Sequence, residues 1–236
     1  MRRLIPQLAA AAMLSWSGGS VVAADGPVLV ELYTSQGCSS CPKADAFFKE
    51  LSARDDVVAL ALHVDYWDYM GWQDTFGSPE NTARQRGYAR AQGQKMVYTP
   101  QMVINGTDQA VGTHRIDVID LVDAHLAEDS GGVSLDIARD GDAVRLTARA
   151  SRRFDTPLIV QRVRIRSEAT VTIKRGENAG RVARHVNIVT GIEHLAEWDT
   201  QAPLVLEMAA GEGASSVVLL QEGRHGPIVA AARVGP

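Results

Sequence analysis

Cysteine is scarce in this sequence, aromatic residues are few, and positive charge is not in excess. The two cysteines, Cys38 and Cys41, form a single Cys-x-x-Cys pair, and the six histidines are scattered along the 236 residues. A structural zinc site needs a second pair of ligands at suitable spacing, so the sequence favours redox chemistry over zinc binding. The formal net charge of -4 offers no basic surface for nucleic acid. Beyond the N-terminal region, no apolar run is long enough to cross a bilayer.

The N-terminal segment, residues 1–24, has the pattern of an export signal. Arg2 and Arg3 form a basic start, residues 4–14 are largely apolar, and Val22-Ala23-Ala24 offers small or compact residues before a cleavage position at Asp25. We therefore expect a periplasmic or secreted protein in an oxidising compartment, with no membrane segment left after cleavage. Removing the two arginines changes the formal charge from -4 to about -6.

The two cysteines lie between an apolar run and an amphipathic run. Residues 28–33 are predicted to form a buried strand and residues 43–51 a helix, with Gly37 permitting a sharp turn between them. A helix N-terminus presents unpaired N–H groups and the positive end of the helix dipole. If the helix begins near Cys38, that thiolate is stabilised and attacks, while Cys41 is close enough to close an intramolecular disulfide. A purely structural disulfide is the alternative, but a disulfide that closes so short a loop removes little conformational entropy from the unfolded chain.

A second apolar run brings more candidate residues to the same place. Residues 57–64 are predicted to form a strand, and in a right-handed parallel unit both strands end on one edge of the sheet. The residues at and after its end should therefore lie on the edge that carries Cys38. His63 and Asp65 are candidates for proton transfer and Trp67 for a substrate-facing wall, although lone histidines and loop aromatics are more often structural.

The following segments complete an α/β unit. Thr99-Pro100 directly precedes an apolar run, where a proline is tolerated and a cis bond would be a deliberate feature. The other predicted elements are a helix at 79–91, a strand at 101–104, a turn at Asn105-Gly106, a short strand ending near Val111 and a helix at 114–128.

After Gly131-Gly132 the pattern changes to short alternating runs with polar turns. This pattern predicts a C-terminal β-rich domain at 133–236, mostly antiparallel and sandwich-like. The predicted strands lie at 133–138, 143–148, 158–165, 170–174, 182–189, 204–208, 217–221 and 228–233. The loop from Arg175 to Arg181 is an interdomain contact, a partner site or only a long hairpin loop, and the last is favoured because charged loops are usually just solvated.

The order of elements in the first unit, residues 25–129, resembles the thioredoxin fold. In that fold a cis-proline loop faces the dithiol and holds a substrate chain. The resemblance assigns this loop to Thr99 and Pro100, and we add Gly37 and Trp67 as residues that a substrate backbone approaches. The sequence departs from ordinary thioredoxins at the dithiol, where Ser39-Ser40 replaces Gly-Pro, so their redox potential is not carried over.

Four stretches together resemble a family of secreted bacterial proteins catalogued as domain of unknown function 1223. They are residues 31–42, 63–68, 98–101 and 175–181. The resemblance covers essentially the whole chain after the export signal. It implies a thioredoxin-like domain in an exported protein and names no substrate.

We expect an exported thiol–disulfide oxidoreductase that uses the Cys38–Cys41 pair and no further cofactor or metal. Its partners would be protein or small-thiol clients and a recycling redox partner. One alternative is a metallochaperone for Cu(I), which soft thiolates select, with His63 as a third ligand. The other is a non-catalytic binding module with a redox-sensing disulfide, in which the β-rich domain binds the partner. The sequence does not give the direction of the redox chemistry.

Overall fold

An eight-stranded mixed sheet runs through most of the chain in the computed structural model, which describes residues 26–128, 131–210 and 215–235. The export signal predicted for residues 1–24 lies outside the described residues. The helices are α1 Cys41–Ser52, α2 Pro79–Ala91 and α3 Arg115–Ala127, with a short 3-10 turn η1 at Asp68–Met70. The strands are β1 Val28–Thr34, β2 Val57–His63, β3 Gln101–Ile104, β4 Asp108–Val111, β5 Val133–Asp140, β6 Ala143–Ala150, β7 Leu158–Thr172, β8 Val182–Trp198, β9 Leu204–Ala209, β10 Ser216–Glu222 and β11 Ile228–Val234.

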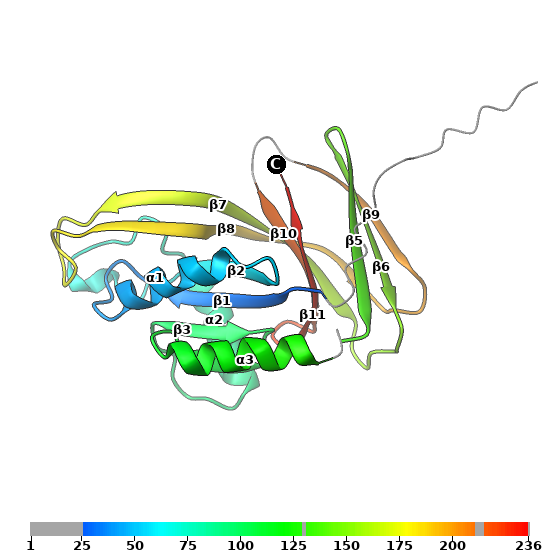
Figure 1. The fold of residues 1–236 in the computed structure, drawn as a ribbon, viewed down its shortest axis with the longest axis horizontal. Helices are drawn as coiled ribbons and strands as arrows, with labels where there is room; N and C mark the ends of the chain where they lie inside the picture. The colour runs from blue at the N-terminus through cyan, green and yellow to red at the C-terminus, as the bar shows by residue number, and fades with distance from the viewer. Residues whose placement is uncertain (1–25, 129–130, 211–214, 236) are drawn as a thin grey trace, which may run out of the picture.

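The large sheet has the strand order β11-β10-β7-β8-β2-β1-β3-β4 (Figure 1). β1 pairs with β2 in parallel and with β3 in antiparallel orientation. Every residue of β1 and β2 is buried, and all but Glu31, Thr34 and His63 are apolar, as expected for strands covered on both faces. The chain is thus an α/β protein, as predicted.

Helices cover both faces of the four strands β2, β1, β3 and β4. Phe47 and Phe48 of α1 and Val118 of α3 share one core with one set of alternating strand residues. Tyr88 of α2 shares the opposite core with the other set, to which β7, β8, β10 and β11 also contribute. Alternate side chains of β1 and β2 therefore belong to two different cores, one on each face of the sheet. The C-terminal ends of the two strands, Thr34 and His63, lie side by side at one edge.

The C-terminal half extends the same sheet instead of forming a separate sandwich. β8 lies in parallel beside β2, with Ala61 opposite Ile188, and β7 pairs with β8 along a long hairpin. The predicted break between residues 165 and 170 is absent, because this polar stretch finds its backbone partners across the hairpin. The large sheet therefore contains strands from both sides of the predicted boundary at residues 129–133.

A second, three-stranded sheet of order β5-β6-β9 covers the far end of the large sheet. Its residues Val144, Leu146 and Ala148 pack in one core with Val160 of β7 and Val218 of β10. A two-layered arrangement is thus present at this end, but one of its layers belongs to the large sheet.

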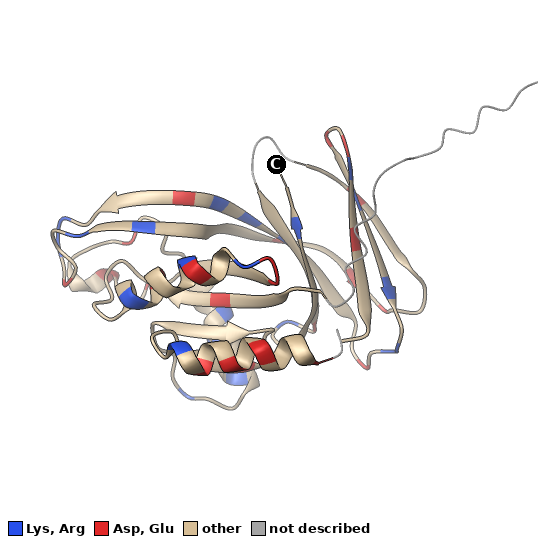
Figure 2. Ribbon diagram, viewed as in Figure 1, with Lys and Arg blue, Asp and Glu red and all other residues tan. Residues whose placement is uncertain are grey.

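Charged residues of both signs are interspersed along the helices and strands (Figure 2). In the part of the chain that the structure describes, no helix has the length and apolar character needed to cross a bilayer.

Candidate functional site

Cys38 and Cys41 form a disulfide in the turn between β1 and α1. The turn is closed by two backbone bonds, from Cys38 N–H to the Ser35 carbonyl at 3.1 Å and from Cys41 N–H to the Cys38 carbonyl at 3.3 Å. The helix begins at Cys41, three residues after Cys38, with Ser40 as its N-cap and Pro42 in its first turn. Cys38 Sγ is 3.3 Å from the Ser40 hydroxyl. A thiolate at Cys38 would therefore have a hydroxyl and a helix N-terminus beside it.

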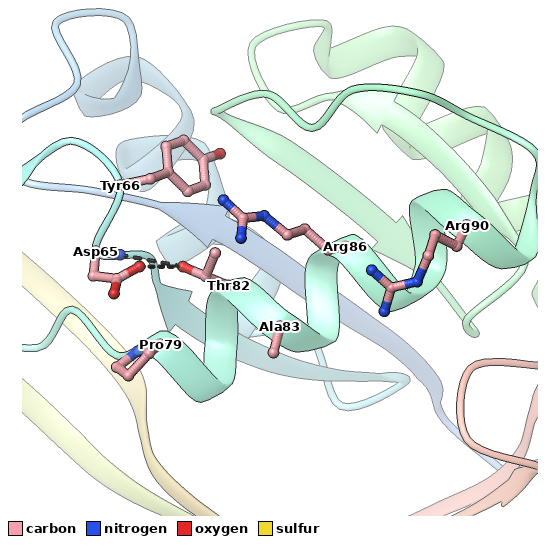
Figure 3. Close-up of a pocket in the computed structure, with 7 residues that line it drawn as sticks. All are labelled: Asp65, Tyr66, Pro79, Thr82, Ala83, Arg86 and Arg90. Atoms are coloured by element: carbon pink, nitrogen blue, oxygen red, sulfur yellow. Dashed lines mark hydrogen bonds between the residues drawn. The ribbon is translucent and has the colours of Figure 1, made fainter.

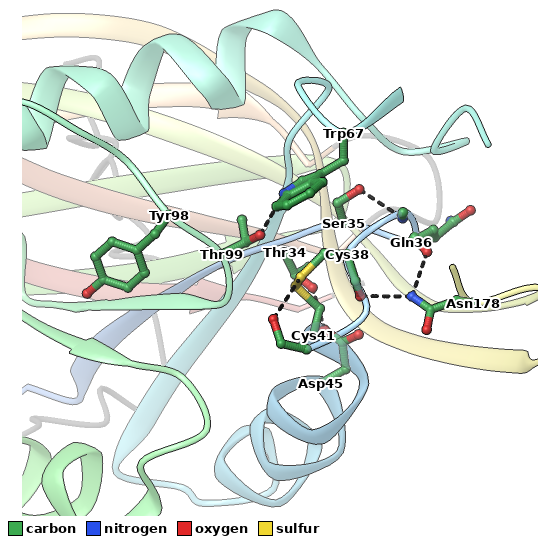
Figure 4. Close-up of a disulfide and its surroundings, with 12 residues drawn as sticks. Thr34, Ser35, Gln36, Cys38, Cys41, Asp45, Trp67, Tyr98, Thr99 and Asn178 are labelled. Atoms are coloured by element: carbon green, nitrogen blue, oxygen red, sulfur yellow. Dashed lines mark hydrogen bonds between the residues drawn. A yellow bond between two sulfur atoms is a disulfide. The ribbon is translucent and has the colours of Figure 1, made fainter. Parts of the chain in front are cut away.

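Gly37, Trp67, Thr99 and Pro100, all predicted as substrate-binding residues, lie around this turn. A Cβ on Gly37 would be 3.2 Å from Trp67 Cβ, so the two chains pack directly together. Trp67 Nε1 donates a hydrogen bond of 2.7 Å to Thr99 Oγ1 (Figure 4). The Thr99–Pro100 bond is cis.

Gly112 brings Pro100 close to the dithiol helix. A Cβ at this glycine would lie 3.1 Å from Ala44 Cβ of α1 and 3.2 Å from Pro100 Cβ. The Gly112 N–H also donates to the Pro100 carbonyl at 2.9 Å. Gly112 therefore lies close to both the proline loop and the helix, one turn beyond Cys41.

His63 and Asp65, predicted for proton transfer, do not come together. His63 is completely buried, and its Nδ1 is 2.7 Å from Asp74 Oδ2. Asp65 instead accepts a hydrogen bond of 2.6 Å from Thr82 Oγ1. Its carboxylate lines a hollow of about 420 Å³ on α2 that Arg86 also lines (Figure 3).

Asp74, which sequence reasoning missed, joins the 65–77 loop to the dithiol turn. Its carboxylate accepts hydrogen bonds from the backbone N–H groups of Gln36 at 2.7 Å and Phe76 at 2.8 Å, in addition to the contact with His63. Burial alone would raise the pKa of Asp74, but these bonds, first of all that from His63, hold it below its ordinary value. Asp74 is thus a buried charge that fixes the Gln36 backbone.

Asp45, one helical turn after Cys41, is the second acidic residue that sequence reasoning missed. Its side chain is 15% exposed, and its Oδ1 accepts a hydrogen bond of 2.8 Å from Thr34 Oγ1. Burial raises the pKa of this carboxyl to about 6, which His63 and the Thr34 bond only partly oppose. Nothing in the sequence pattern signals it clearly, because a single acidic residue on an amphipathic helix is usually solvated.

His185 of β8 lies beside these groups. Its Nδ1 is 3.9 Å from Asp45 Oδ2, and its ring meets that of His63 edge-on with centroids 4.6 Å apart. Burial, followed by the positive potential of His63, lowers the pKa of His185 to about 4. Its imidazole is therefore neutral at physiological pH. A cavity of about 410 Å³, lined among others by Asp45, Asn178 and His185, separates α1 from the β7–β8 hairpin tip.

The loop from Arg175 to Arg181 contacts the dithiol turn. Asn178 is 2% exposed, and its Nδ2 donates to the backbone carbonyls of Gln36 at 3.0 Å and Cys38 at 2.8 Å. Figure 4 shows Asn178 to the right of the disulfide and Trp67 above it. The loop is thus more than a solvated hairpin end.

Histidine, cysteine and acidic side chains do not gather in groups of three that could hold a metal ion, within the ranges that the structure describes. His63, the predicted third ligand for Cu(I), is engaged by Asp74 and lies 5.3 Å from Phe76 between ring centroids.

Three comparisons relate the chain to known proteins. A family model described as "Protein of unknown function (DUF1223)" matches residues 29–221. The X-ray crystal structure of protein AGR_C_4864 from Agrobacterium tumefaciens is 32% identical, with a TM-score of 0.77, and the match covers 89% of this chain and 95% of that one. HBP35 of Porphyromonas gingivalis is 12% identical, with a TM-score of 0.61 over 90% of this chain and 76% of that one, which is a likeness of fold alone. The search of curated proteins found no match.

Proposed function

The chain belongs to the family described as protein of unknown function DUF1223, and we propose that it is a thiol–disulfide oxidoreductase that acts through Cys38 and Cys41. The observation that carries the proposal is the disulfide at the start of α1, with Gly112 close both to this helix and to Pro100 of the cis-proline loop. A disulfide that closes so short a loop stabilises a fold little, so its position beside a helix N-terminus favours reactivity over stapling.

The arrangement around the dithiol supports a thioredoxin-like assignment for the first part of the chain. Strands in the order β2-β1-β3-β4, parallel in the first pair and antiparallel in the others, carry α1 and α3 on one face and α2 on the other. A cis proline precedes β3. We propose that this unit is the thioredoxin-like part and that the remaining strands were added to its β2 edge.

The reaction transfers two electrons between the protein and a client. The Cys38 thiolate attacks one sulfur of a client disulfide, the client S–S bond breaks, and the released client thiolate takes up a proton. Cys41 then loses its proton and attacks Cys38 Sγ, which breaks the mixed disulfide and releases the second client thiolate. The client ends as two thiols and the protein as the Cys38–Cys41 disulfide. The reverse sequence oxidises a client dithiol, and a dithiol or disulfide partner restores the starting state.

Asp45 is the group we propose to accept the Cys41 proton. Residues four apart on a helix are neighbours on its surface, and Figure 4 places Asp45 beside Cys41. A carboxyl with a pKa of about 6 accepts a proton at neutral pH and returns it to a leaving thiolate. His63 and Asp65, in contrast, are held by Asp74 and Thr82.

The location and partners are proposed from the sequence and the chemistry. Residues 1–24 have the pattern of an export signal, so we propose a periplasmic or secreted protein whose clients are polypeptides or small thiols. In that compartment a recycling redox partner decides which form of Cys38 and Cys41 accumulates.

Two cysteine variants test the proposal. Cys38→Ser should abolish disulfide exchange with a fluorescent peptide disulfide, because it removes the attacking sulfur. Cys41→Ser should keep the first step and accumulate a mixed disulfide with the peptide, detectable by intact mass. Exchange at the wild-type rate in Cys38→Ser would contradict the mechanism, provided that circular dichroism shows the variant to be folded.

A further inference from the structure

Asn178, far along the chain from the cysteines, holds the backbone of the dithiol turn. Its Nδ2 donates both of its hydrogens, one to the Gln36 carbonyl and one to the Cys38 carbonyl, at 3.0 and 2.8 Å (Figure 4). The Cys38 carbonyl also accepts the Cys41 N–H at 3.3 Å. The same oxygen thus receives one bond that closes the turn from within and one that fixes it from outside.

The segment that carries Asn178 is itself rigidly placed. Within it, the Arg181 N–H donates to the Asn178 carbonyl at 3.1 Å, and the Ile173 N–H donates to the Arg181 carbonyl at 2.9 Å. Gly176, with a φ of +74°, lies so close to Trp72 that a Cβ on it would be 3.2 Å from Trp72 Cβ. The amide is therefore presented to the turn in a fixed position and does not have to be ordered when it binds.

Gln36 extends this contact to the neighbouring loop. Its Oε1 accepts the indole N–H of Trp72 at 2.8 Å, and its backbone N–H donates to Asp74. Three residues from outside the turn, Asn178, Trp72 and Asp74, thus form hydrogen bonds with it. Asn178 alone among these contacts the backbone of a cysteine.

We propose that Asn178 is a positioning residue that stabilises the disulfide form of the dithiol. This inference rests on the proposed function. With both carbonyls bonded, the turn is held in the conformation that brings Cys38 and Cys41 together, which raises the effective concentration of one thiol at the other. Without the amide, the Gln36 carbonyl loses this partner and the Cys38 carbonyl keeps only the Cys41 N–H in the closed turn, whereas both can reach water when reduction lets the turn open. Loss of Asn178 therefore favours the dithiol.

The test measures the equilibrium of wild type and variants with reduced and oxidised dithiothreitol. Each turnover moves two electrons and two protons, as dithiothreitol closes to its cyclic disulfide and Cys38 and Cys41 become thiols. Asn178→Ala should shift the equilibrium constant about tenfold toward the dithiol, as expected for loss of a hydrogen bond. For a two-electron couple this corresponds to about 30 mV.

Two further variants separate positioning from a general loss of stability. Asn178→Asp has the same shape and leaves no cavity. Its ionised carboxylate faces the two carbonyl oxygens without a donor, so it should shift the equilibrium in the same direction. Asn187→Gly is the matched control. Asn187 lies in the same β7–β8 hairpin, its Nδ2 donates at 3.1 Å to the Ala59 carbonyl of β2, and its φ of +49° suits glycine. It should destabilise the fold and leave the redox equilibrium within twofold of wild type.

The outcomes distinguish this inference from the proposed function. A wild-type equilibrium that titrates normally, together with unchanged constants in both Asn178 variants, would overturn the role of Asn178 alone. An equal shift in Asn187→Gly would also overturn it, because the effect would then follow stability. A wild-type disulfide that does not exchange at all would overturn the proposed function and this inference with it.

Discussion

Trp67 Nε1 donates a hydrogen bond of 2.7 Å to Thr99 Oγ1 and so ties the 65–77 loop to the loop before β3. The backbone and Cβ of Trp67 also pack on Gly37, next to Cys38. Cys38 itself is only 1% exposed. A client sulfur can reach Cys38 Sγ only when the surroundings of the turn open, and the Trp67–Thr99 bond opposes a separation of the two loops.

We predict that Trp67→Phe speeds reduction of the disulfide by dithiothreitol by about two- to tenfold, the range expected for loss of one neutral hydrogen bond. Stopped-flow kinetics under excess reductant measures this rate. Trp198→Phe is the matched control, since Trp198 Nε1 donates at 2.8 Å to the Ala202 carbonyl at the end of β8. A rate in Trp67→Phe equal to or below that of wild type would show that this bond does not limit access.

Asp45 and His185 respond to pH in opposite ways. The pKa of Asp45 is raised to about 6, so the fold disfavours its ionised form, and this penalty disappears as pH falls from 6 to 4. The pKa of His185 is lowered to about 4 in the folded protein. Between pH 6.5 and 4 the unfolded chain therefore binds a proton at His185 that the folded protein does not bind, and stability is lost as pH falls through this range. In the wild type the two effects offset each other.

When either residue is substituted, the effect of the remaining residue on the pH dependence of stability should no longer be offset. Asp45→Asn should stabilise the protein at pH 8 by about 1 to 3 kcal/mol and make it lose stability on acidification below pH 6.5. His185→Asn should instead gain stability between pH 6 and 4. Urea unfolding at pH 8, 6 and 4.5, compared with wild type at each pH, measures these differences. An Asp45→Asn variant less stable than wild type at pH 8 would contradict the assignment.

Arg84 is a buried cation between the two halves of the chain. Its Nε donates to Glu31 Oε1 of β1 at 2.7 Å, and its Nη1 donates to Gln221 Oε1 of β10 at 3.2 Å. Arg84→Met should cost about 3 to 5 kcal/mol in urea unfolding, because it leaves Glu31 as an unpaired buried charge. Arg90→Met, at an exposed position on the same helix, should change stability by less than about 0.5 kcal/mol.

The double variant Glu31→Gln, Arg84→Met provides the internal check. Replacing both members of a buried ion pair is often close to neutral, whereas removing one is not. Recovery of most of the lost stability in the double variant is therefore expected. A double variant as unstable as Arg84→Met would show that the loss comes from packing instead of charge.

The strand–helix–strand unit could be predicted because local patterns determine it. β1 and β2 are mostly apolar since both strands are buried on both faces, and α2 occupies the predicted residues 79–91, with Ser78 as its N-cap. The approach of Trp67 to the dithiol followed from topology, because parallel strands end on one edge of the sheet. The helix was predicted at residues 43–51, and α1 is slightly longer, from Cys41 to Ser52, with Ser40 as its N-cap.

Long-range pairing limited the prediction of the second half and of part of the site. Asn178 is 140 residues beyond Cys38, and its role depends on a hairpin long enough to carry it across the sheet. That length was not visible, because the polar residues of β7 beyond Ile165 look like a turn when their partners in β8 are unknown. Asp45 was overlooked for a different reason: a single acid on a helix is usually solvated, and only packing buries it.

The reduction potential of Cys38 and Cys41 tests the central claim most directly. The purified chain would be equilibrated in glutathione and dithiothreitol buffers, its thiols trapped with an alkylating reagent, and the product fractions determined by mass. We predict a reversible two-electron titration with a midpoint between about -270 and -120 mV, the range of catalytic dithiols. A disulfide that resists reduction until below about -300 mV, as structural disulfides do, would contradict the proposed function.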